Sequence, residues 1–443
     1  MMKKIFILVS ILICLLSKVN SQDIPMVNPG IKTSKSVMDN FMDLRFGMFI
    51  HWGPVTLRGK DISWSRGSQI PTDDYDSLYK EFDPVLFNAD DWVKTAYDAG
   101  MKYLTITAKH HDGFCLWPSK YSRHTIAYTP YKKDIVGALA SACKKYGIKF
   151  CIYYSVLDWF NPDYPLHSPK DKAPDPKAHM DRYLVFMKNQ LKELVTKYDP
   201  YMMWFDGAWE SPWTQQMAVD MYAYLKSLKK NLIINNRLGK EIAGLENKKI
   251  DFSKMIGDYD TPEQTVGRMN MDIPWESCIT ICQNWAWVPN DKMKSLQECI
   301  HILASTAGGN GNLLLDVGPM MDGRIEARQI KRLKEIGNWL KKYGEAIYGT
   351  KGGPYKPNAD FATTRKANKI YLNVFKTDTT HIVLKPLLQR KITKSWLLDG
   401  KAVSYSQNER EITIQLPAIM PDKNCSVIVL QLDGNVMDIP VIE

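Results

Sequence analysis

Several apolar runs in the chain end in residues whose side chains could do chemistry. Asp206 follows the run Tyr201–Phe205 and precedes Gly207. A carboxylate at the end of a buried strand is held rigidly and is partly desolvated, so it could act as a nucleophile, a general base or a metal ligand. The structural alternative for such an aspartate is a helix N-cap.

Two glutamates could supply a second carboxyl group beside Asp206. Glu263 lies in a loop that a proline interrupts, and Glu276 lies at or near a predicted strand entrance. Cleavage of a glycosidic bond needs such a pair, with one group as the nucleophile and the other as the acid and then the base. Glu276 could instead be a buried group that organises Arg237 or a histidine, and Glu263 an exposed loop charge. Spacing alone does not choose between them.

Histidines, aromatic rings and a carboxylate form a second group. His110 and His111 are adjacent, and Asp112-Gly113 after them marks the end of a strand. Adjacent side chains on a strand point to opposite faces, so both histidines can line one site only if the strand has ended. With Trp117 nearby, this set is more typical of a sugar site than of a metal centre. A zinc site that also includes His51 is the minor alternative.

These residues lie at the ends of regularly spaced apolar runs between about residues 35 and 345. The predicted strands are Phe46–His51, Tyr103–Ala108, Lys149–Ser155, Met202–Asp206, Leu232–Asn236, Ser277–Ile281 and Asn312–Val317. Amphipathic patterns between them predict helices such as Asp181–Lys197, Thr214–Lys229, Lys294–Ala304 and Arg328–Tyr343. Repeated strand-then-helix units predict an α/β fold, a (β/α)8-like TIM barrel, whose catalytic groups should lie at the C-terminal ends of the strands.

The pattern changes after Tyr348. A linker rich in Gly and Pro is followed by short alternating runs, which predict a C-terminal antiparallel β-sandwich. The runs are Lys369–Val374, His381–Leu384, Ser395–Leu398, Glu411–Gln415 and Ser426–Gln431. We therefore expect the barrel to occupy residues 22–349 and the sandwich residues 350–443.

The N-terminus has the pattern of a signal peptide over residues 1–21. Lys3 and Lys4 precede the apolar stretch Ile5–Leu16, and small residues precede Gln22. Export to the periplasm or the medium is therefore expected, with lipid anchoring at Cys14 as a minor alternative. The apolar stretch is too short to span a bilayer, and no later segment is long enough. The seven remaining cysteines are expected to be buried free thiols, because an odd number does not make a complete disulfide framework.

Composition excludes several classes of protein. Hydrophobic residues make up 45% and charged residues 24% of the chain, which is typical of a soluble globular protein. The net charge of +10 is scattered rather than gathered into a basic patch, which argues against a nucleic-acid partner. The 13 Trp, 22 Tyr and 14 Phe suit a large core and also a site that packs against apolar ring faces.

Five ordered motifs together resemble the α-L-fucosidases of glycoside hydrolase family 29. They are Phe46–Gly53, Lys109–Trp117, Trp204–Gly207, Trp275–Cys278 and Gly311–Pro319. The resemblance runs from about residue 35 to the end of the chain. It implies a barrel followed by a sandwich, and retaining hydrolysis of terminal α-L-fucose without a metal or other cofactor.

The resemblance also implies roles for individual residues. Asp206 matches the nucleophile, Glu263 is preferred over Glu276 as the acid/base, and Glu276 matches a supporting glutamate. The positions expected to contact the sugar are His51, Asp61, Trp64, His110, His111, Tyr154, Trp209, Arg237 and Trp285. Asp61 departs from the family pattern, which has a glutamate there, so its shorter side chain could weaken a hydrogen bond to the sugar.

Three other functions remain open from the sequence. A related glycosidase could act on an L-galactoside, which shares the hydroxyl pattern of L-fucose. The chain could also be a glycan-binding protein that has lost catalysis, or a metal-dependent hydrolase. In each glycan-directed case the partner is a fucosylated or similar oligosaccharide or glycoconjugate.

Overall fold

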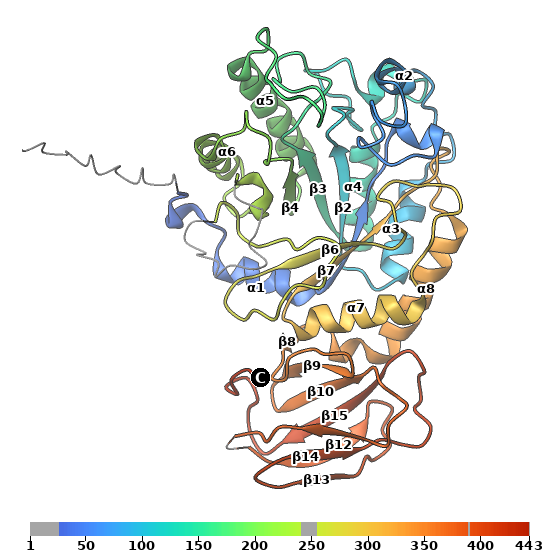
Figure 1. Ribbon diagram of the computed structural model, residues 1–443, viewed down its shortest axis with the longest axis vertical. Coiled ribbons are helices and arrows are strands. Elements are labelled where there is room, and N and C mark those ends of the chain that lie inside the picture. Colours follow the sequence, from blue (N-terminus) through green and yellow to red (C-terminus); the bar gives the residue numbers. More distant parts are fainter. Residues whose placement is uncertain (1–25, 241–254, 389, 443) are drawn as a thin grey trace, which may run out of the picture.

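The computed structural model describes residues 26–240, 255–388 and 390–442, so the predicted signal peptide lies outside the described residues. Its larger part is built on one parallel sheet of seven strands, in the order β5-β4-β3-β2-β1-β7-β6. A smaller part made of antiparallel strands follows it in the chain and lies on one side of it (Figure 1).

The seven parallel strands coincide closely with the predicted runs. They are β1 (Phe46–Ile50), β2 (Tyr103–Lys109), β3 (Lys149–Ser155), β4 (Met202–Asp206), β5 (Ile233–Ile234), β6 (Glu276–Thr280) and β7 (Asn312–Val317). Nearly every residue in them is buried. A parallel strand covered on both faces is continuously apolar rather than alternating, which accounts for the sequence pattern.

Strand β5 is shorter than its predicted run. The side chain of Asn235 bonds to both the backbone N–H and the carbonyl oxygen of Phe205, at 2.7 and 2.9 Å. The amide therefore takes the place of backbone ladder bonds. A 3-10 turn, η5 (Asn236–Leu238), begins at the next residue and carries Arg237.

The two edge strands of the sheet, β5 and β6, are connected through the segment 259–263. Isolated parallel bridges pair Asn235 with Tyr259, Asp260 with Trp275, and Glu263 with Cys278. The segment thus occupies the gap between the edges, and Glu263 lies at its end. The described residues therefore show a curled seven-stranded parallel sheet completed by an irregular segment, rather than eight regular β/α repeats.

Most helices cover the outside of this sheet, and the first one closes the N-terminal ends of its strands (Figure 1). They are α1 (Lys35–Leu44), α2 (Thr72–Ser77), α3 (Ala89–Asp98), α4 (Ile135–Tyr146), α5 (Met180–Tyr198), α6 (Gln215–Leu228), α7 (Leu296–Gly308) and α8 (Ala327–Tyr343). Several begin at residues that cap them: Ser295 and Glu298 form a capping box at α7, and Asp134 accepts a hydrogen bond from Gly137 at α4. Among the described helices, none has the length and apolarity needed to cross a bilayer.

Large aromatic side chains fill the inside of the curled sheet. Tyr103, Tyr153 and Trp204 form one buried cluster with inward residues of the neighbouring strands. Phe41 of α1 packs edge-on against Tyr103, with ring centroids 5.7 Å apart, and closes this cluster at the N-terminal ends of the strands. Open space remains at the opposite, C-terminal ends.

The C-terminal part consists of two antiparallel sheets. The five-stranded sheet has the order β12-β15-β10-β9-β8 and the three-stranded sheet the order β11-β14-β13. The strands are β8 (Lys351–Gly352), β9 (Phe361–Lys366), β10 (Lys369–Val374), β11 (His381–Leu384), β12 (Ile392–Leu397), β13 (Tyr405–Gln407), β14 (Ile412–Gln415) and β15 (Ser426–Leu432). Leu372, Ile414 and Leu430 belong to one apolar cluster that both sheets share, as in a sandwich.

The five-stranded sheet of the C-terminal part packs its outer face on helices α7 and α8 (Figure 1). Trp339 of α8 donates its indole N–H to the carbonyl oxygen of Cys425 at 2.8 Å, and His301 of α7 lies 2.7 Å from that of Asn424. The C-terminal part is therefore attached to α8 and α7 of the larger part by hydrogen bonds.

Candidate active site

A cavity of about 120 Å³ opens at the C-terminal ends of the parallel strands. It is far smaller than the several hundred Å³ usual for drug-sized ligands, so it suits one small unit of a larger ligand. The residues that line it belong to four of the strands and to the segments that follow strands: Phe49, His51, Trp64, His110, His111, Tyr153, Trp204, Asp206, Trp209, Arg237, Glu263, Cys278 and Trp285.

Asp206 is the last residue of β4 and points into this cavity. Its Oδ2 accepts a hydrogen bond from the Tyr153 hydroxyl at 3.1 Å, and its Oδ1 accepts one from Nη1 of Arg237 at 3.2 Å. Burial, and then the charge of Asp206, raise the pKa of Tyr153, so this phenol remains protonated and able to donate. Both oxygens of the carboxylate are therefore held in place by donors.

Arg237 connects Asp206 with Glu263. Its Nε donates to Oγ1 of Thr261 at 2.9 Å and its Nη2 to the Thr261 carbonyl oxygen at 3.0 Å, which fixes the plane of the guanidinium. Nη1 then reaches Oδ1 of Asp206 and also Oε2 of Glu263, the latter at 2.6 Å. Burial acts to lower the pKa of Arg237, but the nearby carboxylates outweigh it and raise this pKa.

Three histidines form one wall of the cavity, and each has its Nδ1 engaged. Nδ1 of His51 lies 2.7 Å from Oδ1 of Asp316, that of His110 lies 2.6 Å from Oγ of Ser63, and that of His111 lies 2.7 Å from Oγ of Ser155. Burial is the main cause that lowers the pKa of all three rings well below the usual value, so they are neutral.

The two adjacent histidines share the cavity because β2 ends at Lys109, directly before them. The sequence predicts this condition from Asp112-Gly113. Their ring centroids are 4.1 Å apart.

Three tryptophans form the rim. The rings of Trp64 and Trp209 lie nearly parallel, at 19°, with centroids 6.3 Å apart, and about two-fifths of each side chain is exposed. Both rings contact His111 edge-on. Trp285 packs on His51 with centroids 4.6 Å apart. The cavity thus combines apolar ring faces, neutral imidazoles and charged oxygens, which is a composition suited to a sugar ring.

Comparison with known proteins gives a family for this arrangement. The family model described as Alpha-L-fucosidase matches residues 17–345, which include every residue that lines the cavity. The chain belongs to this family. Its members are glycoside hydrolases, as the sequence resemblance predicts.

Relatives and solved structures agree with this assignment. The α-L-fucosidase of Dictyostelium discoideum is 28% identical over 421 residues, covering 86% of this chain and 88% of that protein, and the tissue α-L-fucosidase of Bos taurus is 31% identical over 340 residues, covering 70% and 69%. Isoenzyme 1 of Paenibacillus thiaminolyticus superposes with a TM-score of 0.81 at 31% identity, over 90% of this chain and 99% of that one. A trapped covalent intermediate of an α-L-fucosidase from Bacteroides thetaiotaomicron, in complex with 2-fluoro-fucosyl fluoride, superposes with a TM-score of 0.82 at 30% identity, over 93% and 100%.

Within this fucosidase-family chain the second candidate glutamate, Glu276, does not line the cavity. It is fully buried, and its carboxylate accepts hydrogen bonds from Tyr103 at 2.5 Å, Trp204 at 3.0 Å and Tyr259 at 3.4 Å. Burial raises its pKa to about 7. Glu276 therefore links three aromatic side chains beneath the cavity and lies in the position of a supporting group.

Tyr154, an expected sugar contact, does not line the cavity; its neighbour Tyr153 lines it instead. The Tyr154 hydroxyl donates to Oε1 of Gln190 at 2.8 Å, and Lys109 lies over its ring on the helix side of the sheet. Neighbouring residues of a strand face opposite sides, so a shift of one position exchanges inside and outside. Because β3 is apolar on both faces, polarity in the sequence does not show which tyrosine points inward.

Asp61 is also absent from the cavity lining. Its Oδ1 accepts hydrogen bonds from the backbone N–H groups of Ile62 and Ala286, at 3.0 and 2.9 Å. Burial raises its pKa. Because Ala286 follows Trp285, this carboxyl group fixes the loop that presents Trp285.

Four lining residues were missed from the sequence: Phe49, Tyr153, Trp204 and Cys278. Two of them carry a usable signal. Trp204 is two residues before Asp206 on β4, and Phe49 is two residues before His51, so the period of two along a strand places each on the same face as its partner. For Cys278 and Tyr153 the sequence offers no comparable indication that the side chain faces the cavity.

The described residues contain no cluster of three or more His, Cys, Asp or Glu side chains arranged to hold a metal ion. Cys278 and Cys282, which have the spacing of a metal pair, are both buried. The other described cysteines are buried and unpaired as well.

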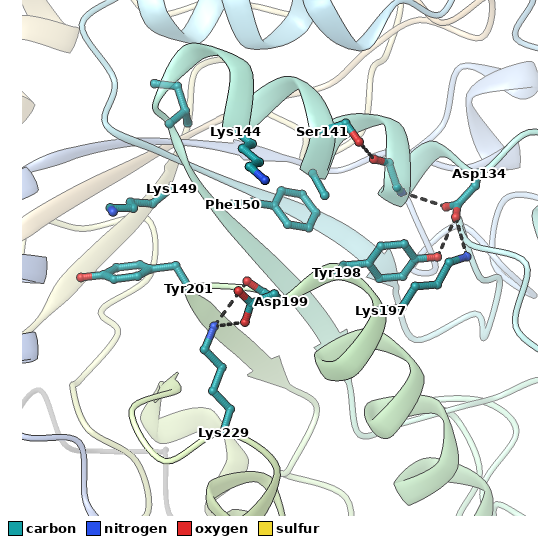
Figure 2. Close-up of a pocket in the computed structure, with 13 residues that line it drawn as sticks. Asp134, Ser141, Lys144, Lys149, Phe150, Lys197, Tyr198, Asp199, Tyr201 and Lys229 are labelled. Atoms are coloured by element: carbon teal, nitrogen blue, oxygen red, sulfur yellow. Dashed lines mark hydrogen bonds and ion pairs between the residues drawn. The ribbon is translucent and has the colours of Figure 1, made fainter.

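A larger cavity, of about 640 Å³, lies at the N-terminal ends of β3 and β4 (Figure 2). Two of its lysines are paired with carboxylates in its wall, Lys197 with Asp134 at 2.8 Å and Lys229 with Asp199 at 2.5 Å. It contains none of the predicted site residues. In parallel barrels this end of the strands serves stability rather than catalysis.

Proposed function

We propose that this protein is an exported, retaining exo-α-L-fucosidase that removes terminal α-L-fucose from glycans through a covalent fucosyl–Asp206 intermediate. One observation carries the proposal. Asp206 and Glu263 both contact Nη1 of Arg237, so their two oxygens lie within about 6 Å of each other, whereas inverting glycosidases hold their carboxyl groups about 6.5–9.5 Å apart and retaining ones about 5–5.5 Å.

In the first step the carboxylate of Asp206 attacks the anomeric carbon of the fucose, and Glu263 donates a proton to the departing glycosidic oxygen. In the second step Glu263 takes a proton from water, the water oxygen attacks the anomeric carbon, and Asp206 leaves as a carboxylate. While Asp206 is esterified it carries no charge, so Glu263 is the remaining carboxylate partner of Arg237.

The walls of the cavity support a sugar as the reacting group. The neutral histidines and Arg237 can bond hydroxyl groups, and the rings of Trp64, Trp209 and Trp285 can cover the ring carbons and the methyl group of a 6-deoxy sugar. The small volume of about 120 Å³ favours an exo mode, in which one terminal residue enters and the rest of the glycan stays outside.

Azide rescue tests the two carboxylate roles. Asp206→Gly should be almost inactive, and azide should restore turnover with β-fucosyl azide as the product. Glu263→Ala should give α-fucosyl azide from a substrate with an activated leaving group. If Glu276→Ala shows this rescue and Glu263→Ala keeps full activity, the assignment of the acid/base is wrong.

Three comparisons test the alternatives. Nitrophenyl α-L-fucoside should be cleaved faster than the nitrophenyl L-galactoside; the reverse order would assign the enzyme to the second sugar. Any turnover above background removes the binding-only function. Undiminished activity in a chelator removes a metal-dependent hydrolase. A release profile on defined fucosylated oligosaccharides would then give the linkage preference.

Export rests on the pattern of residues 1–21. N-terminal sequencing of the mature protein from its native host should begin near Gln22. A mature protein that retains Met1 would contradict it.

A further inference from the structure

We propose that Ser63 and Ser155 are positioning residues that hold the neighbouring rings of His110 and His111 in opposite tautomers. His110 then presents an N–H donor to the cavity, and His111 presents a bare nitrogen acceptor. That these groups bind a sugar rests on the proposed function. The positions of the two ring protons, by contrast, are a property of the free protein.

The argument for His111 begins with the hydroxyl of Ser155. This hydroxyl lies 2.9 Å from the carbonyl oxygen of Leu157, which can only accept, so its single proton is directed there. The contact of 2.7 Å between Oγ of Ser155 and Nδ1 of His111 then needs a proton from the ring. Nδ1 of His111 is therefore the N–H, and Nε2 has a free lone pair facing the cavity.

The hydroxyl of Ser63 is arranged the other way. Its oxygen already accepts a hydrogen bond from the backbone N–H of Asp112 at 3.0 Å. The group is fully buried, and its remaining partner is Nδ1 of His110 at 2.6 Å. A buried hydroxyl proton without an acceptor costs about 1–3 kcal/mol, so this proton is donated to Nδ1. The ring proton of His110 is therefore on Nε2.

Both rings are neutral, which is the condition for a single tautomer. Burial, and then the proximity of the two rings, lower the pKa of His110. Burial, followed by His51, Lys109 and Arg237, lowers that of His111. With ring centroids only 4.1 Å apart, two imidazolium ions would repel each other.

The assignment changes the meaning of one contact in the cavity. Nε2 of His111 lies 3.7 Å from Oδ2 of Asp206, a distance that would otherwise suggest an ion pair. Without a proton on Nε2, two acceptors face each other across this gap. A sugar hydroxyl beside His111 must therefore act as a donor, whereas a hydroxyl beside His110 must accept.

Neutron diffraction from crystals of the ligand-free, deuterated protein tests the inference directly. We expect deuterium on Nδ1 of His111 and on Nε2 of His110. Deuterium on Nε2 of His111, or on Nδ1 of His110, would overturn the assignment for that ring. This measurement needs no substrate, so it remains decisive even if the protein does not cleave fucosides.

Kinetics with serine variants test the positioning role. Each of the variants Ser155→Ala and Ser63→Ala should raise KM for a nitrophenyl fucoside about 3- to 10-fold, which is the effect of losing the net contribution of one hydrogen bond. The kcat of each variant should stay within about twofold of the wild-type value. The hydroxyl-retaining Ser155→Thr should recover most of the loss at that position. A KM that changes only together with kcat would indicate a merely structural role and overturn the proposal.

Ser119→Ala is the matched control. Its buried hydroxyl oxygen accepts hydrogen bonds from the Gln190 side chain at 3.2 Å and from the backbone N–H of Tyr121 at 3.3 Å, and neither donor is a histidine. It should lose stability as Ser63→Ala does and keep its KM. If the KM values of Ser63→Ala and Ser155→Ala do not differ from that of Ser119→Ala, neither serine positions a ring.

Discussion

The hydroxyl group of Tyr153 donates a hydrogen bond to Oδ2 of Asp206, with the two oxygens 3.1 Å apart. The two residues lie on neighbouring parallel strands, β3 and β4, where Tyr153 pairs with Trp204 and Ser155 with Asp206. The donor therefore reaches the carboxylate from a fixed position two residue pairs before the Ser155–Asp206 pair in the ladder. Arg237 holds the other oxygen, so the nucleophile cannot rotate without breaking one of two hydrogen bonds.

Tyr153→Phe should slow the second chemical step more than the first. The phenol stabilises Asp206 as a carboxylate, which is consumed when the intermediate forms and regenerated when it is hydrolysed. With an activated leaving group, kcat should fall about 10-fold, which is the lower end of the effect of a hydrogen bond to a charged group, and KM should fall with it. Stopped-flow measurement should show a burst of released nitrophenol.

Tyr154→Phe is the control for this experiment, because it removes the same atom from the next residue of the strand. Its hydroxyl bonds to Gln190 in the core. We expect a loss of about 1 kcal/mol in the free energy of unfolding and an unchanged kcat. A burst of nitrophenol from Tyr154→Phe and none from Tyr153→Phe would show that Tyr154, and not Tyr153, points into the cavity.

Arg237→Lys should lower kcat/KM by about 100-fold. The ammonium keeps the charge but cannot hold Thr261, Asp206 and Glu263 together, because that geometry needs the planar fork of arginine. The matched control is Arg365→Lys in the sandwich, where a buried guanidinium bonds the backbone carbonyl oxygens of Gly352, Val436 and Ile439. It should lose stability and keep its kcat/KM; equal losses in kcat/KM would show that the effect of Arg237 is structural.

Glu276→Gln should change how stability depends on pH. The pKa of Glu276 is raised to about 7 in the folded protein, from 4.5, so the folded state holds a proton that the unfolded state has released. Stability from this group is therefore present below about pH 4.5 and is lost as the pH rises to about 7, by on the order of 3 kcal/mol. Glutamine does not titrate.

Urea unfolding from pH 5 to 7 measures this difference between the variant and the wild-type protein. The free energy of unfolding of Glu276→Gln, relative to the wild type, should rise across the range. The buried histidines act in the opposite direction, because their lowered pKa values cost stability as the pH falls below 6.5, but they are common to both proteins. A difference that does not vary with pH would contradict the raised pKa.

Trp64→Ala and Trp209→Ala should each raise KM, by about 10-fold, with little effect on stability. Each ring is about two-fifths exposed, so truncation leaves no core cavity. Because the two rings are stacked, their effects should not add, and a double-mutant cycle should give a coupling of about 0.5–1.5 kcal/mol. Additive KM effects would mean that the rings bind the substrate independently.

The positions of the parallel strands along the chain and the place of Asp206 at the end of one of them could be predicted because both depend on local pattern. Buried strands form continuous apolar runs, and each run ends where a polar residue enters the mouth of the sheet. The ending of β2 before His110 was visible for the same reason, since Asp112-Gly113 cannot continue a strand.

The remaining features depend on contacts between distant parts of the chain. Tyr153 and Tyr154 are equivalent in the sequence, and only packing against α5 on one side and against the cluster of Trp204 on the other distinguishes them. The role of Asp61 depends on the backbone N–H of Ala286, which is 225 residues away in the sequence. The pairing of Arg237 with Glu263 depends on the irregular segment 259–263, which has no strand pattern of its own.

That segment gives the two carboxylates unequal stiffness. The backbone of Asp206 belongs to a strand paired on both sides, whereas that of Glu263 is attached to β6 through one isolated bridge to Cys278. In the proposed mechanism the nucleophile is therefore fixed by the sheet, whereas the acid/base is carried by a segment with fewer backbone pairings. If the proposed roles hold, we expect adjustment to leaving groups of different shape to involve the segment of Glu263 more than the strand of Asp206.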